Sequence, residues 1–243
     1  MHFYSLPILD VRTLTADSKA IVFDCSAFPP DTIIRPGQYI TVKVDVDGSS
    51  ERRSYSISRY SQENSTLEIG VKRVPNGKVS NLANSQWKMG DSIECSGPEG
   101  NFTLTDKTPV HHVFFAAGSG ITPIIHMVDH VINSRGERAT LFFGNSSSSD
   151  VMYKEELRTL SSNPNLSVLQ IFTDGSTGTP LTSGRIDFGK ATQLVHECVD
   201  NPLAAHFYMC GPSCMIDSVT NALEDQGVSA DNIHLEYFVS PDE

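Results

Sequence analysis

The segment RRSYSIS, residues 52–58, brings a guanidinium, an aromatic ring and hydroxyls together in a stretch that alternates like a β-strand. Successive side chains of a strand point to opposite faces, so Arg53 and Tyr55 are expected on one face and Ser54 and Ser56 on the other. Cations, rings and hydroxyls are the groups that grip phosphate, stack on planar ligands and exchange hydrogen bonds. The same residues are also common on the solvated face of an edge strand. The segment alone leaves both interpretations open.

A second segment, AAGSGITP at residues 116–123, places Gly-x-Gly-x-x-Pro between a predicted strand and a predicted helix. Gly118 and Gly120 allow the backbone to approach a ligand closely, and the new helix offers free N–H groups to a pyrophosphate. Pro123 suits the first helical position, where no N–H is needed. A plain tight turn is the alternative interpretation, but the position at the first helix of the second half favours a nucleotide site.

Two other segments could contribute to a ligand site. In MCGPSCM, Cys210 ends a predicted parallel strand, where open sheets bind ligands, although a free cysteine is more often a small buried residue. We assign Cys214 to that second class. In GVKRVPNGKVSNL, Gly77 and Ser80 could offer an N–H and a hydroxyl to phosphates, or could form an ordinary turn and helix cap.

The composition excludes several classes of protein. The chain has 243 residues, 39% hydrophobic and 19% charged, and its net charge of −11 disfavours nucleic-acid binding. No membrane span or secretory signal is visible, which favours the cytoplasm. The five cysteines are scattered and lack the spacing of an iron–sulfur cluster site. No metal site is expected, because the pair His126 and His130 lacks the glutamate of a zinc-protease helix.

The two halves of the chain have different hydrophobic rhythms. Residues 1–106 show short alternating runs broken by turns, which predicts an antiparallel β-barrel with one helix near residues 80–87. Residues 107–243 alternate strand and helix, which predicts an α/β domain with a parallel sheet. The expected fold class is therefore a barrel domain followed by an α/β domain, with the boundary near residues 107–109.

In chain order, the motifs RSYS, GKVSN, GPEGNF, AAGSGITP, FFGN, CGP and a terminal EYF resemble the ferredoxin–NADP reductase superfamily. The resemblance covers almost the whole chain. It implies an FAD-binding barrel, an NAD(P)-binding α/β domain, and the cofactors FAD and NADH or NADPH. It also implies that Arg53 meets the FAD pyrophosphate, Tyr55 packs on the isoalloxazine, and Ser56 hydrogen-bonds near flavin N5.

The same resemblance assigns the remaining site residues. The implied catalytic residues are Ser56, Cys210 beside the nicotinamide, and Glu236 near the flavin edge, while Phe238 is implied to close the flavin pocket. The implied cofactor-binding residues include, at the FAD pyrophosphate, Gly77, Lys78, Val79 and Ser80, and, toward the nicotinamide nucleotide, Gly118, Gly120, Thr122, Asn145, Asp174, Arg185, Cys210, Gly211 and Pro212.

A narrower similarity points to the oxygenase reductases, among them the reductase subunit of the phenylacetyl-CoA epoxidase system. It is carried by FYSL, SGRID, FYMCGPSCMIDSVTNAL and IHLEYFVSP. In those proteins a plant-type ferredoxin domain follows a short linker, so we expect VSPDE, residues 239–243, to begin such a linker. The implied partner is an iron–sulfur electron acceptor, either a ferredoxin domain or a separate protein, with an oxygenase component beyond it.

The predicted function is an FAD-dependent NAD(P)H reductase that passes single electrons to an iron–sulfur acceptor. One alternative is a free-flavin reductase of the same fold, which would release reduced flavin instead of keeping FAD bound. A second is a non-catalytic subunit that binds FAD to sense redox state. The Thr173-Asp174 pair favours NADH, whereas Arg185 could pair with the 2′-phosphate of NADPH.

Overall fold

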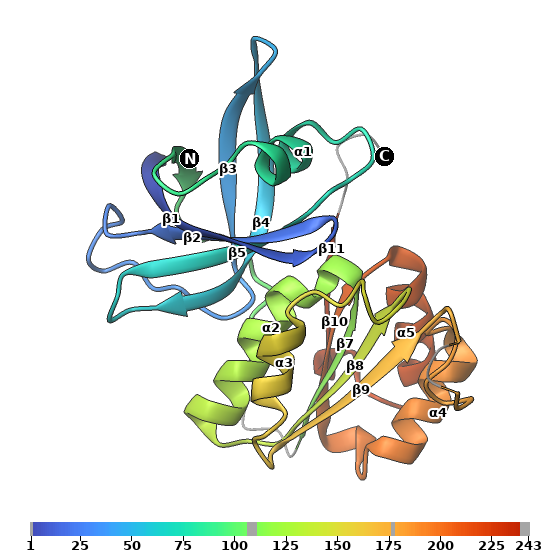
Figure 1. The fold of residues 1–243 in the computed structure, drawn as a ribbon. Coiled ribbons are helices and arrows are strands. Elements are labelled where there is room, and N and C mark those ends of the chain that lie inside the picture. The colour runs from blue at the N-terminus through green and yellow to red at the C-terminus, as the bar shows by residue number, and fades with distance from the viewer. Residues whose placement is uncertain (1, 106–110, 176–177, 239–243) are drawn as a thin grey trace. The chain divides into compact units, whose positions relative to one another are not determined.

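The chain forms two compact units, residues 1–104 and residues 105–243. The computed structural model describes residues 2–105, 111–175 and 178–238 (Figure 1). The boundary predicted near residues 107–109 and the predicted linker at residues 239–243 lie outside the described residues. No helix within the described ranges is both long enough and apolar enough to cross a membrane.

The first unit is a closed antiparallel barrel, as the alternating runs predicted. Its strands follow the order β1-β2-β5-β4-β3-β6 around the barrel. They are β1 (Phe3–Thr15), β2 (Ser18–Asp24), β3 (Tyr39–Val46), β4 (Ser49–Ser61), β5 (Thr66–Lys72) and β6 (Ser92–Ser96). Helix α1 (Lys78–Ser85) lies between β5 and β6 in the sequence and packs on β3, β4 and β5. Inward-facing aliphatic side chains such as Leu6, Ile40 and Ile69 fill the barrel and are fully buried.

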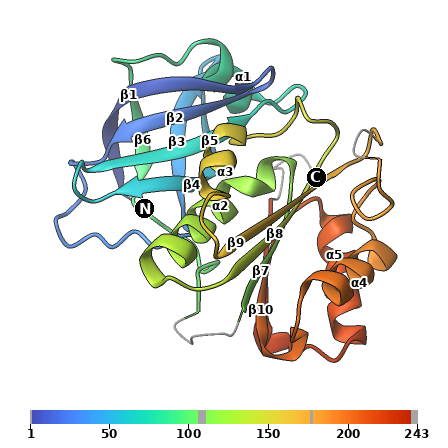
Figure 2. The same cartoon turned by 60° about the horizontal axis from the view of Figure 1, so that its bottom comes forward.

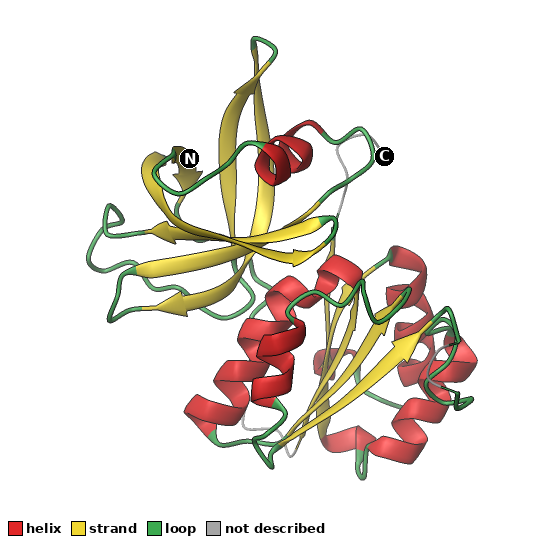
Figure 3. Ribbon diagram, viewed as in Figure 1, coloured by secondary structure: helices red, strands yellow, loops and turns green. Residues whose placement is uncertain are grey.

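The second unit is an α/β domain with a five-stranded parallel sheet. The strands are β7 (His111–Ala117), β8 (Ala139–Asn145), β9 (Leu166–Phe172), β10 (Ala205–Gly211) and β11 (Ile233–Tyr237), in the order β11-β10-β7-β8-β9. The helices are α2 (Ile121–Asp129), α3 (Lys154–Leu160), α4 (Phe188–Cys198) and α5 (Ser213–Asp225). Helices α2 and α3 cover one face of the sheet and α4 and α5 the other (Figures 1 and 3). The near-continuous apolar strands reflect this two-sided burial.

The alternating runs that predict the barrel strands begin with AIVFDC at residues 20–25, so β1 was not among the predicted strands. A proline within an apolar run demotes a strand prediction, because proline cannot donate to the ladder. In the structure Pro7 is the last residue of β1 that pairs with β6, and from Ile8 onward β1 pairs with β2. The proline therefore lies where the strand changes neighbours, and Leu6 and Ile8 on either side of it fill the core.

Two predicted helix starts were wrong. Pro123 is the third residue of α2, because a 3₁₀ turn at Gly118–Gly120 leads directly into a helix that begins at Ile121. Proline is tolerated there because the first-turn N–H groups have no helical partners. The segment DVMYKEELRTL, residues 150–160, predicts a helix over its whole length, but α3 begins only at Lys154, because Tyr153 is buried and adopts a left-handed backbone with φ of 58°.

Histidines on three adjacent strands of the α/β sheet are buried or, in the case of His234, half-buried. Burial lowers the pKa of His111 and of His234 to about 4 from the ordinary 6.5, with a smaller contribution from Arg138 and from His206 respectively. His206 and His234 stack, with a 3.0 Å contact between Nδ1 and Nε2. Between pH 6.5, the ordinary pKa, and pH 4, the folded pKa, these histidines bind more protons in the unfolded chain than in the folded one. Their contribution to the free energy of unfolding is therefore fully present above about pH 6.5 and is lost as the pH falls toward 4.

We therefore expect the free energy of unfolding to decrease as the pH falls from 7 to 5, and His234→Gln to flatten that decrease by about one proton. The measurement is urea unfolding at a series of pH values, with exposed His196→Gln in α4 as the matched control. An equally steep pH dependence in His234→Gln and wild type would contradict this prediction.

Candidate functional site

The carboxyl ends of β7 and β10 form the centre of the candidate nucleotide site. The sheet order reverses between these two strands, since β8 and β9 extend from β7 on one side while β11 extends from β10 on the other. Open α/β sheets bind ligands at such a switch point, outside the carboxyl ends of the strands. The turn Gly118–Gly120 follows β7, and Gly211 and Pro212 follow Cys210 at the end of β10. The structure thus brings two of the sequence-predicted motifs side by side.

Gly120 is in direct backbone contact with β10. A Cβ built on Gly120 would lie 2.0 Å from the Cys210 carbonyl oxygen and 2.8 Å from the Gly211 nitrogen, so no side chain fits there. Gly118, in contrast, has φ of 52° and would place a Cβ in open space. The first glycine is needed for a left-handed backbone and the second for close approach. Thr122, also buried, donates from its hydroxyl to the Ser119 carbonyl at 3.0 Å and holds the turn.

Cys210 and Glu236 lie at paired positions of β10 and β11. Cys210 is fully buried, and burial raises the pKa of its thiol well above the ordinary value, with a further contribution from Glu236. Burial likewise raises the pKa of the Glu236 carboxyl. The cysteine is therefore a neutral thiol at physiological pH. Phe238, the last described residue, is 43% exposed.

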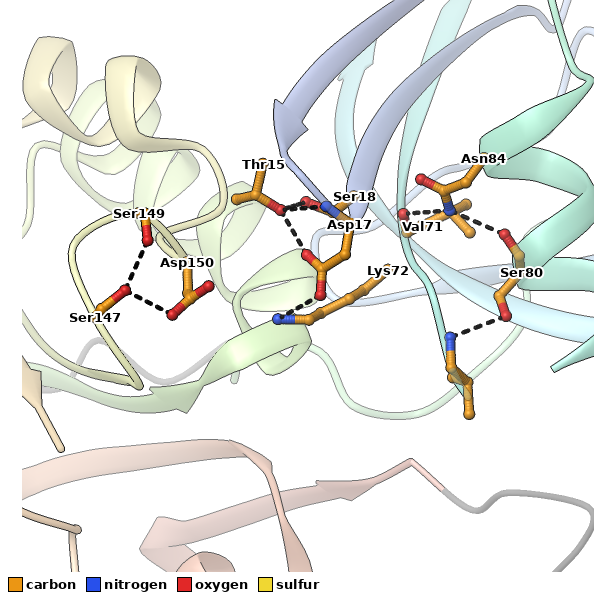
Figure 4. Close-up of polar contacts among 11 residues, drawn as sticks. Thr15, Asp17, Ser18, Val71, Lys72, Ser80, Asn84, Ser147, Ser149 and Asp150 are labelled. Carbon is orange, nitrogen blue, oxygen red and sulfur yellow. Dashed lines mark hydrogen bonds and ion pairs between the residues drawn. The ribbon is translucent and has the colours of Figure 1, made fainter. Parts of the chain in front are cut away.

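The carboxyl end of β8 presents an unpartnered amide. Asn145 is 6% exposed, and among the described residues neither its side-chain oxygen nor its nitrogen has a hydrogen-bond partner. Leaving a buried amide unpaired costs about 1–3 kcal/mol, which a bound polar ligand would offset. The loop that follows is braced by Ser147, whose hydroxyl donates to Asp150 and lies 2.7 Å from that of Ser149 (Figure 4).

The segment after β9 brings Asp174 and Arg185 to one edge of the sheet. The Gly184 N–H donates to the Phe172 carbonyl and the Phe172 N–H donates to the Thr182 carbonyl, both at 2.9 Å. Both charged side chains are exposed. Asp174 and Arg185 thus both follow β9 at the same end of the sheet.

In the barrel unit, one face of β4 carries Glu51, Arg53 and Tyr55 at alternate positions. All three are half-buried, while Arg52 and Ser54 between them are exposed. Burial raises the pKa of Tyr55, which packs against the barrel core. Ser56 points the other way, is 6% exposed and pairs with Tyr39 of β3. The alternation predicted for residues 53–56 is therefore present.

The turn before α1 presents Gly77, Lys78 and Val79 at the helix N-terminus. Ser80 organises this turn, because its hydroxyl accepts from the Val74 N–H at 3.2 Å and its carbonyl accepts from Asn84 at 2.9 Å (Figure 4). A Cβ on Gly77 would lie 2.5 Å from the Ser80 hydroxyl oxygen. The serine predicted to meet phosphate is thus engaged in shaping the loop that carries Lys78.

The predicted site residues form two groups, one in each unit. The barrel group comprises Arg53, Tyr55, Ser56 and residues 77–80, and the α/β group surrounds the carboxyl ends of β7 to β11. Glu51 was not predicted, although its position two residues before Arg53 in an alternating strand places it on the same face. The cations of the barrel unit suit a dinucleotide pyrophosphate, as do, in the α/β unit, the open position at Gly118 and the Asn145 amide, which has no partner among the described residues.

Residues 5–104 match the family described as "Oxidoreductase FAD-binding domain", and residues 114–221 match "Oxidoreductase NAD-binding domain". The chain belongs to the ferredoxin reductase superfamily and is an oxidoreductase that uses FAD and a nicotinamide dinucleotide, which confirms the fold class and the resemblance stated above.

Two curated relatives are similar over nearly the whole chain. The chain is 31% identical to one of the subunits of the 1,2-phenylacetyl-CoA epoxidase of Escherichia coli, over 98% of this chain and 68% of that protein. It is 26% identical to the reductase component of propane 2-monooxygenase of Rhodococcus jostii, over 97% and 65%. The chain therefore spans about two thirds of each relative's length. The flavohem-like FAD/NAD-binding domain of a Vibrio cholerae nitric oxide dioxygenase has the same fold, with a TM-score of 0.84 and 23% identity over 96% of this chain and 98% of that one.

We expect Gly120→Ala to lower the free energy of unfolding by about 1–3 kcal/mol, because the added methyl must displace the β10 backbone. The matched control is Gly189→Ala in α4 of the same unit, where a Cβ would meet its nearest atom at 3.8 Å. Urea unfolding followed by circular dichroism measures both. A Gly120→Ala variant as stable as Gly189→Ala would show that the close approach of the two backbones is not required.

Proposed function

We propose that this reductase passes electrons from NAD(P)H through FAD to an iron–sulfur carrier that serves an oxygenase. The relatives support this proposal, since one is named as part of an epoxidase and another as the reductase component of a monooxygenase. The five cysteines are scattered and lack cluster spacing, so the carrier in this proposal holds its iron–sulfur centre on other cysteines.

In the barrel, Arg53 and Lys78 would hold the FAD pyrophosphate. Their cationic groups come from β4 and from the N-terminus of α1, and both approach one carboxylate, that of Glu51. Two cations that converge in this way at the start of a helix would suit an anion, and this observation supports the proposed position of the pyrophosphate. Tyr55 would pack on the isoalloxazine, and the Ser56 hydroxyl would donate to or accept from flavin N5.

In the α/β unit, the turn Gly118–Gly120 and the first turns of α2 and α5 would bind the nicotinamide dinucleotide. Gly211 and Pro212 shape the second of these turns, and the amide of Asn145 would gain the partner that the described residues do not give it. When both cofactors are bound, the nicotinamide supplies a hydride and the flavin releases its electrons singly.

Cys210 and Glu236 would act beside the nicotinamide and the flavin edge. A neutral buried thiol can pack against a ring and position it, but it is a poor nucleophile. The Glu236 carboxyl, whose pKa is raised by burial, can hold or release a proton closer to neutral pH than an exposed carboxyl can. Phe238 would cover the flavin and limit the access of water.

We expect Arg53→Ala to weaken FAD binding by about 1.5–3 kcal/mol, because a charge-assisted hydrogen bond to the pyrophosphate is lost. Fluorescence titration with FAD measures the change. The matched control is Arg52→Ala, whose side chain lies on the other face of β4, with its guanidinium 5.1 Å from the Phe3 ring. Equal FAD affinity in Arg53→Ala and wild type would remove Arg53 from the site and defeat the proposed placement of FAD.

We propose that NADH is the preferred donor, because the Asp174 carboxylate can accept from a ribose 2′-hydroxyl and repels a 2′-phosphate. The ratio of kcat/KM for NADH to that for NADPH should exceed one, and Asp174→Ala should lower it by about tenfold. Arg185→Ala should raise the ratio, since it removes a guanidinium that could pair with the 2′-phosphate of NADPH. A wild-type preference of tenfold or more for NADPH would overturn the proposal and implicate Arg185.

A further inference from the structure

Three charged side chains meet where β4 passes the N-terminus of α1. The Glu51 carboxylate lies 3.3 Å from the Arg53 guanidinium and 2.5 Å from the Lys78 ammonium, with one oxygen toward each cation. The same Arg53 nitrogen also donates to the Arg52 carbonyl at 2.7 Å. One carboxylate therefore links the two cations that the proposed function assigns to the pyrophosphate of FAD.

The arrangement is built into the fold. Only 15% of the Glu51 side chain and 25% of the Arg53 side chain are exposed, so solvent screens this pair less than an ordinary surface pair. The hydrogen bond from Lys78 lowers the pKa of Glu51, with further contributions from the charges of Lys78 and Arg53, and the group is a carboxylate at neutral pH. Ser80 and Asn81 fix the turn that carries Lys78, because Asn81 donates to the Gly77 carbonyl at 2.6 Å.

The charges decide what the carboxylate does to a second anion. Arg53 and Lys78 together carry two positive charges, and Glu51 cancels one of them. A pyrophosphate that binds the same two cations must therefore displace the carboxylate from at least one of them, or lie beside a like charge. Either outcome weakens the binding of the pyrophosphate relative to a site without Glu51.

We propose that Glu51 sets the affinity for FAD by competing with the pyrophosphate for Arg53 and Lys78. The proposal rests on the proposed function of these two cations and adds a residue that opposes them. The effect of Glu51 on affinity is then specific to FAD, because FAD carries the pyrophosphate that competes with the carboxylate. Riboflavin, which has the same ring system and no phosphate, is insensitive to Glu51.

The test is Glu51→Gln, which keeps the shape of the side chain and removes its charge. At low ionic strength the dissociation constant for FAD falls about fivefold, a typical effect of one partly screened charge. The full chain is titrated with FAD and separately with riboflavin, and flavin fluorescence is followed. The matched control is Glu94→Gln on β6 of the same barrel, a carboxylate that lies 2.9 Å from the Lys43 ammonium and contacts neither Arg53 nor Lys78.

Three results would overturn the competition. These are FAD binding in Glu51→Gln that is no tighter than in wild type, an equal gain for riboflavin, or an equal gain in Glu94→Gln. A full gain in a background that carries both Arg53→Ala and Lys78→Ala would likewise overturn it, since the effect must pass through these two cations. The wild-type protein allows a second test. If the pyrophosphate displaces the Glu51 carboxylate and not ions from solution, the FAD affinity of the wild type depends only weakly on salt concentration. A steep dependence on salt contradicts the proposal.

These outcomes are separate from the failure of the proposed function. If Arg53→Ala binds FAD as well as wild type does, the placement of FAD at these cations is wrong. If Arg53→Ala binds FAD weakly and Glu51→Gln does not bind it more tightly, the cations hold FAD and only the competition is wrong.

Discussion

The contact between Gly120 and the end of β10 is the constraint on which the nucleotide-binding unit depends. At 2.0 Å from the Cys210 carbonyl oxygen there is no room for a β-carbon, so the turn after β7 and the turn after β10 are held against each other by backbone atoms alone. The contact joins the carboxyl ends of β7 and β10, the neighbouring strands between which the sheet order reverses; Figure 2 shows these two strands side by side. It puts the N-termini of α2 and α5 and the buried Cys210 together at the carboxyl ends of β7 and β10.

The barrel organises its half of the site by charge rather than by close backbone contact. Alternation along β4 puts a carboxylate, a guanidinium and a phenol ring on one face, and α1 brings a lysine to the carboxylate. The loop that presents this lysine is held by the hydroxyl of Ser80, a polar contact inside the protein. The two units therefore use different physical means for the same proposed purpose, which is to hold a dinucleotide phosphate at the start of a helix.

The sequence predicted most of the fold because the hydrophobic period changes between the two halves of the chain. It failed where one residue served two purposes. Proline is unfavourable within a strand, but Pro7 lies where β1 changes neighbours, and Tyr153 continues a helical pattern but has a left-handed backbone. The site motifs were visible because glycines and prolines mark turns between elements. Glu51 was missed because a single acidic residue on a strand carries no signal until α1 places Lys78 against it.

The most direct test of the account is anaerobic mixing of the purified, FAD-loaded chain with NADH while the absorbance of the flavin is followed. We expect the yellow colour of the oxidised flavin to be lost at a rate that saturates with NADH concentration, since the FAD-binding and NAD-binding units are both present in these 243 residues. FAD-loaded protein that keeps its oxidised spectrum with NADH and with NADPH would contradict it.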